Sequence, residues 1–313
     1  MKRNFFSLTF LLLLFCLCGC NRSNTGTAKQ NEARAIPQVK AIFINGDSIH
    51  YIDEGKGDPV VFVHGAFGDY RTWEAQMDTF ALRHRVISYS KRLSYPNNQI
   101  INDSTDVTTA GHAKDLAELL KALNLGPVHL VGHSGGGAVA LLTTMEHPEL
   151  VRRLILAEAA VPLLLQNVPH GDSVLNSFYV KTIKPVTEAF KNNNDEKGLS
   201  TFINTVMGDS LYFNNLSQRI QENMMINVVE VKHNIFNESL SPQITCDDLS
   251  KVKVPVLLLI GGKSISIFSL MDDELYRCLS NRERATIINA THGLVSEKPS
   301  EFNKIVLGFI DRH

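Results

Sequence analysis

The sequence has 313 residues, 44% of them hydrophobic and 20% charged, with a formal net charge of −1 at pH 7. This composition is ordinary for a soluble globular chain, and the length is enough to bury a full core in one or two domains. Lysine and arginine are scattered without a basic stripe, which argues against nucleic acid as a partner.

The N-terminus predicts a secretory signal. Residues 1–4 (MKRN) are positively charged, and residues 5–18 form an apolar run too short to span a bilayer as a mature helix. The run ends in Leu17-Cys18-Gly19-Cys20, which resembles a bacterial lipoprotein signal. That resemblance implies removal of residues 1–19, lipidation of Cys20 with palmitate-type chains, and export to a membrane of the bacterial cell envelope. The alternative is a plain signal peptide cut elsewhere.

Residues 20–37 are polar and lack a hydrophobic period, so they are predicted to form a flexible tether. Two cysteines lie in the body of the chain, Cys246 and Cys278. An oxidising compartment permits a disulfide between them, but their spacing does not imply one. Two buried free thiols are the favoured interpretation.

Short apolar runs alternate with helical stretches from Val39 onward. A hairpin is expected around the turn Asn45-Gly46-Asp47, and a helix over residues 106–124 carries one apolar stripe. Further strands are predicted at residues 59–63, 85–89, 127–131, 153–157, 254–260 and 285–289. The alternation predicts an α/β fold, with a mostly parallel eight-stranded sheet and helices on both faces.

An insertion interrupts this alternation. About ninety residues between Ala157 and Val254 show helical patterns and no convincing strand, which is longer than a usual crossover. We therefore expect a helical cap over residues 161–246, above the carboxyl edge of a core formed by residues 38–160 and 247–313. A solvated loop is predicted at residues 191–198. About a third of the large cap side chains are expected to face a pocket. These side chains are Phe178, Phe202, Met207, Phe213, Met224, Met225 and Phe236.

One serine stands in a glycine-rich segment between a strand and a helix. Gly132-His133-Ser134-Gly135-Gly136 fits the pattern G-x-S-x-G, in which a sharp turn exposes the serine hydroxyl. The strained backbone requires residues without Cβ two positions before and after the serine. Ser134 is therefore the candidate nucleophile, placed where helix N–H groups stabilise negative charge. A glycine-rich turn with an incidental serine is the alternative.

Two further segments complete a family pattern: His64-Gly65-Ala66-Phe67-Gly68 after the third strand, and Thr291-His292-Gly293 after the last. Over residues 39–313 the chain resembles the serine-type, cap-bearing α/β-hydrolases, which include carboxylesterases. The resemblance implies an oxyanion hole formed by the backbone N–H groups of Ala66 and Gly135. It makes His64 the histidine of the oxyanion loop, and we expect His64 to contact the substrate.

His133 and Arg92 are also expected near the substrate. His133 occupies the variable position of the serine turn, and Arg92 follows a strand at the same edge of the sheet. For Arg92, an ion pair with a surface carboxylate is the alternative.

His292 is the candidate base, because an imidazole that titrates near neutral pH can take a proton from a serine hydroxyl. The acid that orients it departs from the family pattern, since Ser264 stands where most relatives have aspartate. Glu158 follows the strand LILA, where a carboxylate is costly to bury without a partner, and is the preferred acid. Asp272 or Asp273 is the alternative, and a serine–histidine dyad remains open.

These residues predict a serine hydrolase that cleaves a small-molecule carboxylic ester (class EC 3.1) through an acyl-enzyme. No cofactor is expected, and no metal, since the chain lacks H-E-x-x-H or similar zinc spacing. A C–C bond hydrolase or an acyltransferase on the same fold is one alternative, and an inactive binding module is another. The oligomeric state is left open.

Overall fold

The computed structural model describes residues 37–97, 105–236 and 243–312. The predicted signal peptide, Cys20 and all of the predicted tether except its last residue lie outside these ranges. In the described ranges, no helix combines the length and the apolar character needed to cross a membrane.

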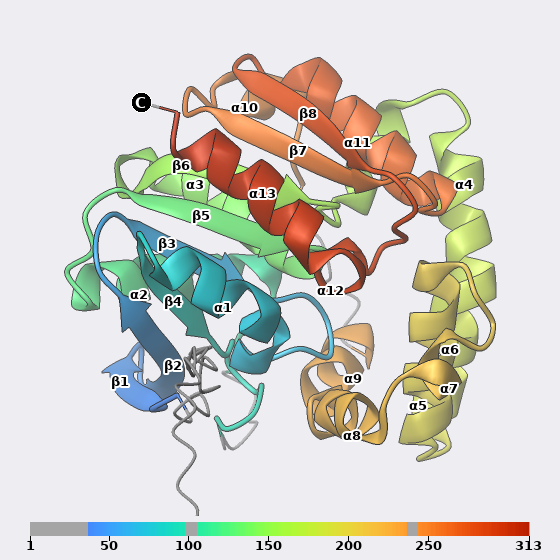
Figure 1. Ribbon diagram of the computed structural model, residues 1–313. Coiled ribbons are helices and arrows are strands. Elements are labelled where there is room, and N and C mark those ends of the chain that lie inside the picture. The colour runs from blue at the N-terminus through green and yellow to red at the C-terminus, as the bar shows by residue number, and fades with distance from the viewer. Residues whose placement is uncertain (1–36, 98–104, 237–242, 313) are drawn as a thin grey trace, which may run out of the picture. The chain divides into compact units, whose positions relative to one another are not determined.

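The core is one eight-stranded sheet with the strand order β1-β2-β4-β3-β5-β6-β7-β8. β2 is antiparallel to β1 and β4, and the remaining neighbours are parallel (Figure 1). The strands are β1 (Lys40–Ile44), β2 (Asp47–Gly55), β3 (Pro59–Val63), β4 (Arg85–Tyr89), β5 (Val128–His133), β6 (Val151–Ala157), β7 (Val256–Gly261) and β8 (Arg282–Ile287). The predicted sheet is confirmed.

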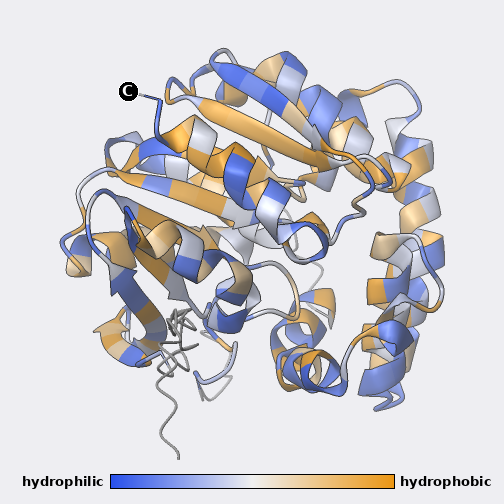
Figure 2. Ribbon diagram, in the orientation of Figure 1, coloured by the Kyte–Doolittle hydropathy of each residue, from blue (hydrophilic) through white to orange (hydrophobic). Residues whose placement is uncertain are grey.

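The last strand begins earlier in the chain than its apolar residues suggested. β8 covers Arg282–Ile287, whereas the pattern predicted residues 285–289. β8 pairs only with β7 at the edge of the sheet, and most of its side chains are exposed or half-buried. Figure 2 shows hydrophilic residues along β8 beside the hydrophobic β7. An edge strand tolerates charged residues, so hydrophobicity alone placed its start too late.

Helices cover both faces of the sheet. On one face, Trp73, Met77 and Phe80 pack with Phe302 and the strands, while on the other face helices α2, α3 and α11 form a larger core. The core helices are η1 (Tyr70–Trp73), α1 (Glu74–Ala81), α2 (Thr109–Ala122), α3 (Gly135–Glu146), η2 (Pro148–Leu150), α11 (Ser266–Cys278), α12 (Leu294–Glu297) and α13 (Pro299–Ile310). The central strands are apolar on both sides because both faces are covered.

In its described part, the segment between β6 and β7 consists of helices joined by turns and contains no strand. Its helices are η3 (Pro162–Asn167), α4 (Gly171–Phe178), η4 (Tyr179–Ile183), α5 (Lys184–Lys191), α6 (Asp195–Met207), α7 (Tyr212–Asn215), α8 (Gln218–Ile226), α9 (Val228–Phe236) and α10 (Cys246–Ser250). Figure 1 shows α5 to α9 grouped apart from the sheet. The expected helical insertion after Ala157 is thus present.

The predicted solvated loop at residues 191–198 was too long. Only residues 192–194 connect α5 to α6, and residues 195–198 form the first turn of α6. Asn194 caps this helix by accepting a hydrogen bond from the backbone N–H of Lys197 at 3.1 Å. Asp195 and Glu196 follow in the first turn, where negative charge is favoured. The second half of this polar run therefore begins a helix, and only its first residues form a loop.

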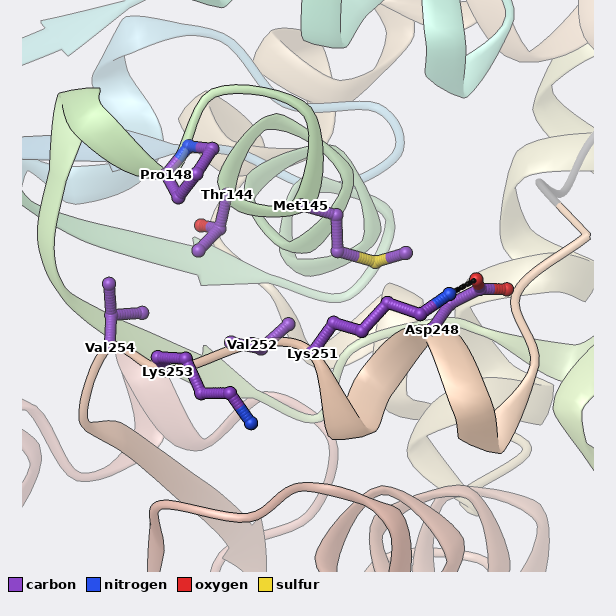
Figure 3. A pocket seen from close by; sticks show the side chains of 8 residues that line it. All are labelled: Thr144, Met145, Pro148, Asp248, Lys251, Val252, Lys253 and Val254. Atoms are coloured by element: carbon purple, nitrogen blue, oxygen red, sulfur yellow. Dashed lines mark hydrogen bonds and ion pairs between the residues drawn. The ribbon is translucent and has the colours of Figure 1, made fainter.

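A shallow hollow of about 140 Å³ lies where the end of α3 meets the segment after α10 (Figure 3). It is lined by Thr144, Met145, Pro148, Asp248, Lys251, Val252, Lys253 and Val254. Lys251 and Asp248 form an ion pair one helical turn apart at 3.1 Å. The lining contains no histidine or cysteine, and its single carboxylate, Asp248, is paired with Lys251, so we do not treat this hollow as a candidate site.

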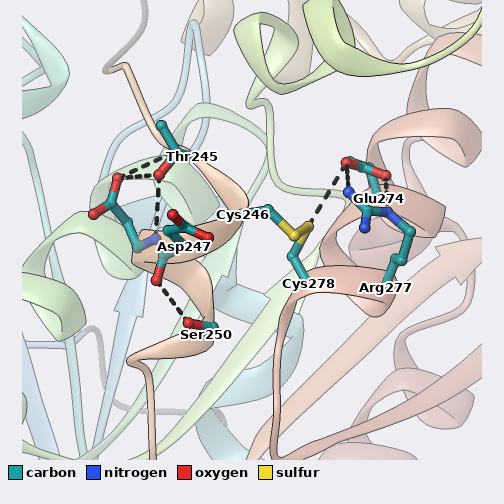
Figure 4. The surroundings of a disulfide bond; sticks show 8 residues. Thr245, Cys246, Asp247, Ser250, Glu274, Arg277 and Cys278 are labelled. Carbon is teal, nitrogen blue, oxygen red and sulfur yellow. Dashed lines mark hydrogen bonds and ion pairs between the residues drawn. A yellow bond between two sulfur atoms is a disulfide. The ribbon is translucent and has the colours of Figure 1, made fainter.

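Cys246 and Cys278 form a disulfide with an S–S distance of 2.04 Å, so the prediction of two free thiols was wrong (Figure 4). The chain starts α10 beside the last turn of α11, which brings the two Cα atoms to 4.9 Å. That approach is a property of the fold and is invisible in the linear spacing. Both sulfurs lie close to Glu274, and these three side chains are of types that bind metal ions. In the disulfide, however, the cysteines are not available as the thiolates that a metal would need.

Removing this cross-link is expected to destabilise the protein. The double variant Cys246→Ala/Cys278→Ala should lose about 2–4 kcal/mol of unfolding free energy, because the unfolded chain regains the freedom of the closed loop. Equilibrium urea denaturation measures the loss. Wild-type protein unfolded with and without a reductant is the control, and equal midpoints in all samples would contradict the expectation.

Candidate active site

Ser134 stands at the turn between β5 and α3 with φ 54° and ψ −126°, a backbone conformation rare for a residue with a Cβ. The surrounding glycines have a steric function. A Cβ on Gly132 would lie 2.4 Å from the Gly136 carbonyl oxygen, and one on Gly136 would lie 2.3 Å from the Val63 carbonyl oxygen. Gly135 has open space at its Cβ position. The two outer glycines are therefore the ones that the turn requires.

The loop after β3 runs directly against this turn. A Cβ on Gly65 would come within 3.1 Å of the Ser134 Cβ, so the loop backbone passes close to the nucleophile. Of the two expected oxyanion donors, Ala66 lines the same cavity as Ser134, and Gly135 directly follows Ser134 in the chain. Gly135 is the first residue of α3, where backbone N–H groups lack helical partners.

His64 is fully buried behind that loop and does not line the cavity. Its Nε2 accepts a hydrogen bond from the backbone N–H of Lys91 at 3.0 Å, so the proton resides on Nδ1, which donates to the Gly65 carbonyl at 2.9 Å. Burial, and then the Lys91 charge, lower the pKa of His64 from 6.5 to about 4. The structure places His64 as a neutral support of the loop, away from the substrate contact expected from the sequence.

Glu158 and His292 meet although 134 residues separate them. Glu158 Oε2 accepts a hydrogen bond from His292 Nδ1 at 2.6 Å. Its Oε1 accepts one from the backbone N–H of Gly261 at 2.7 Å and another from the hydroxyl of Ser264. The carboxylate is thus held by three donors in a buried position immediately after β6.

The environment keeps Glu158 charged. Burial by itself raises its pKa, but hydrogen bonding from His292, the His292 charge and the donors Ser264 and Gly261 together hold the pKa below its ordinary value. Ser264, in the loop after β7, supports the carboxylate of Glu158. The Nε2 atom of His292 is left as the ring nitrogen that can serve Ser134.

The two alternative acids, Asp272 and Asp273, are paired with Arg284. Asp272 Oδ2 pairs with Arg284 Nε at 2.8 Å, and Asp273 Oδ1 pairs with Arg284 Nη1 at 2.9 Å. Burial raises the pKa of Asp272 to about 6, opposed by Arg284 and assisted by the charges of Asp273 and Glu158. The structure therefore brings neither aspartate to His292.

Two aromatic rings pack around His292. Phe268 of α11 is stacked on the imidazole, with ring centroids 3.7 Å apart and an interplanar angle of 11°. His133 Nε2 donates to the His292 carbonyl at 2.8 Å, and the two rings lie 4.8 Å apart. Burial, and then the His292 charge, lower the pKa of His133 to about 3, so it remains a neutral donor. No motif in the sequence indicated Phe268.

Two buried histidines, His64 and His129, and the half-buried His133 are expected to make the protein acid-sensitive. Burial lowers the pKa of His64 and His129 to about 4 and that of His133 to about 3, from 6.5. Below pH 6.5 the unfolded chain binds protons on these rings while the folded protein does not. The free energy of unfolding should therefore fall as the pH falls from about 7 to about 5, as urea denaturation at each pH would show.

His129→Gln is the informative variant for this prediction, because its Nδ1 has no hydrogen-bond partner among the described residues. The substitution should flatten the pH dependence, whereas His147→Gln, at a partly exposed position, should leave it unchanged. Equal slopes for both variants and the wild type would contradict the assignment.

A cavity of about 460 Å³ joins these parts. Ser134, His133 and His292 line it from the core, and α6 to α8 supply much of its wall. No hydrogen bond links Ser134 to the His292 ring in the described structure, as is common for a catalytic pair without substrate. Both side chains nevertheless open into the same space.

Some of the large apolar cap side chains face the cavity, as expected, and others pack in the core. Phe202, Met207 and Met224 line the cavity, and Phe213 is buried within the larger core. Phe178 and Met225 pack partly buried against that core, and the side chain of Phe236 lies outside the described part of the structure. The cavity wall is thus mostly apolar, and its polar lining includes Arg71 and Arg219.

Arg92 is not among the residues that line the cavity. Its guanidinium forms ion pairs with Asp115, at 2.6 Å, and with Asp47. These partners hold it between α2 and the hairpin turn, as the ion-pair alternative anticipated.

Comparison with known proteins agrees with this architecture. Residues 58–267 match the model of the α/β hydrolase fold family, and the chain belongs to this family. An sn-1-specific diacylglycerol lipase of Mus musculus is 25% identical over 80% of this chain and 80% of its own length. An (E)-2-((N-methylformamido)methylene)succinate hydrolase of Acinetobacter baylyi is 23% identical over 85% of this chain and 95% of its own length.

Among solved structures, the carboxylesterase CesB of Bacillus subtilis superimposes with a TM-score of 0.69 and 21% identity. The match covers 88% of this chain and 92% of that one. This likeness shows the shared fold. The family, its esterase- and lipase-like relatives and the cavity chemistry together define a hydrolase.

Proposed function

We propose that this protein is a serine hydrolase that cleaves carboxylic esters. The observation that carries the proposal is the buried Glu158 carboxylate bound to His292 Nδ1, with His292 opening into the cavity that also contains Ser134. A carboxylate in that position selects the imidazole tautomer whose Nε2 accepts a proton, and it stabilises the imidazolium that follows. Ser264 and Gly261 keep the carboxylate oriented.

In the proposed reaction, Ser134 Oγ transfers its proton to His292 Nε2 and attacks the ester carbonyl carbon. The N–H groups of Ala66 and Gly135 bind the oxyanion of the tetrahedral intermediate. The C–O bond then breaks, and His292 returns the proton to the leaving alcohol. Water, activated by the same imidazole, releases the acid and regenerates the serine.

The cavity favours small to medium acyl or aryl esters, because its walls are mainly aliphatic and aromatic and its volume is about 460 Å³. The names of the relatives, a diacylglycerol lipase and a carboxylesterase, support an ester-type bond. Esters, thioesters and amides of graded chain length, compared by kcat/KM, test this class. Preference for amides over matched esters would reject it.

A fluorophosphonate probe tests the mechanism directly. The probe should modify Ser134 of the purified protein covalently, as peptide mass spectrometry would show. Absence of modification would favour the inactive binding module. Product analysis in the presence of an added alcohol separates hydrolysis from acyl transfer, since a transferase would form the new ester in preference to the free acid.

We also propose that the protein is exported and anchored to a membrane by a lipid on Cys20. The lipoprotein-like N-terminal sequence supports this location, and so does the Cys246–Cys278 disulfide, because such bonds persist outside the cytoplasm. Expression with an alkyne palmitate analogue should label the wild type and not Cys20→Ala. Equal labelling, or recovery of both in the soluble fraction, would reject the anchor.

A further inference from the structure

We propose that the buried ion pair between Lys91 and Glu230 positions the oxyanion hole by fixing the cap to the support of the Gly65–Ala66 peptide. The proposal rests on the proposed ester hydrolysis, because it assigns positioning residues to that site. It follows a continuous series of contacts that begins on cap helix α9 and ends at the Ala66 N–H.

The first step is the ion pair itself. Lys91, in the segment after β4, donates from Nζ to Oε1 of Glu230 on α9, and both side chains are buried. Ser94 Oγ donates to Glu230 Oε2 at 3.1 Å, and His112 Nε2 lies 3.5 Å from Oε1. Burial raises the pKa of Glu230, but the charges of Lys91 and His112 outweigh it and hold the pKa far below its ordinary value.

A buried pair of this kind is a poor source of stability, since two charges must lose their water. The pair nevertheless restricts the position of α9, because a shift of α9 away from the core would separate the ammonium from the carboxylate and leave both without a partner. The pair therefore defines one seating of α9 on the core, at a point where α9 meets the segment Lys91–Ser94.

The second step runs through the backbone of the same lysine. The N–H of Lys91 donates to His64 Nε2 at 3.0 Å, which makes Nε2 the acceptor and leaves the proton on Nδ1. Nδ1 then donates to the Gly65 carbonyl oxygen at 2.9 Å. The position of Lys91 thus sets both the tautomer and the orientation of the imidazole.

The third step follows from peptide geometry. The carbonyl of Gly65 and the N–H of Ala66 belong to one planar trans peptide, in which the C=O and N–H bonds point in opposite directions. His64 lies outside the cavity and holds the oxygen, so the N–H of Ala66 is directed to the other side, where Ala66 lines the cavity. A donor fixed before the reaction stabilises the developing oxyanion without reorganisation.

The variant Glu230→Gln tests the link. It keeps the shape of the side chain and removes the charge that holds Lys91. Complete loss of an oxyanion donor lowers kcat by about a hundredfold or more, so a donor that is present but misdirected should lower it by about tenfold. KM for a neutral ester should stay within about twofold.

An alkylboronic acid supplies the readout that a purely structural role would not affect. It forms a tetrahedral adduct with Ser134 whose oxygen occupies the oxyanion position, so its inhibition constant should weaken by the same factor as kcat. Glu230→Asp, which keeps the charge with a shorter reach, should show an intermediate loss and provides the result if Glu230→Gln does not fold.

Asp195→Asn is the matched control. It breaks the ion pair between Lys232, also on α9, and Asp195 on α6, which has no connection to His64. Its kcat and boronate affinity should equal those of the wild type.

The proposal is overturned if Glu230→Gln lowers only the melting temperature, or if kcat and boronate affinity fail to change together. If the wild type itself is neither labelled at Ser134 nor active, the proposed function fails and this inference with it. If the probe labels Ser134 in both the wild type and Glu230→Gln, and the variant keeps the wild-type kcat and boronate inhibition constant, the proposed function stands and only this inference is rejected.

Discussion

Replacing Ser134 by alanine is expected to reduce kcat on the best ester by at least about ten-thousandfold, and toward about a millionfold if the residues act as a unit. The alanine variant keeps the turn but has no oxygen to attack the carbonyl. Its melting temperature should stay close to that of the wild type, because alanine has the same Cβ as serine and leaves the backbone strain of the turn unchanged. Initial rates and a thermal scan on the same preparations measure both quantities.

The control for this variant is Ser210→Ala, at an exposed position between α6 and α7. It should retain full turnover and show that loss of a hydroxyl elsewhere has no effect. Substantial activity in Ser134→Ala would rule out Ser134 as the nucleophile and, with it, the acyl-enzyme.

Replacing Glu158 by glutamine is expected to lower kcat by about a thousand- to ten-thousandfold with a much smaller change in KM. An amide can present its N–H to His292 Nδ1, which stabilises the tautomer that cannot accept the serine proton. The buried imidazolium also loses its countercharge. Steady-state kinetics at several pH values, with fluorophosphonate labelling rates as a second measure, would show the loss.

Ser264 offers a sharper form of this test. Its hydroxyl already contacts Glu158, and it lies in the loop directly after β7. In the variant Glu158→Ala/Ser264→Asp, a carboxylate placed after β7 should recover part of the activity that Glu158→Ala loses. Asp272→Asn is the negative control, since Asp272 is bound to Arg284. Wild-type turnover in Glu158→Gln would remove the acid assignment.

Much of the architecture could be predicted from local patterns. Apolar runs identified the strands, and the segment around Ser134 followed from its spacing and its strand–turn–helix context. The segments around His64 and His292 followed from the resemblance to the α/β-hydrolases. Errors arose where the pattern is weak for a physical reason: edge strand β8 begins with charged residues that face solvent, and the Asn-rich run ends in the acidic first turn of α6.

The fold class and the strained serine turn follow from local patterns in the sequence, because each depends on residues within a few positions of one another. Four contacts become visible in the folded chain alone: Glu158 with His292, Cys246 with Cys278, Arg92 with Asp47 and Asp115, and Lys91 with Glu230. These contacts join segments brought together by the crossovers of the sheet and by the return of the cap. Which residues meet in these contacts depends on their distance in the folded chain, and local sequence patterns do not encode that distance.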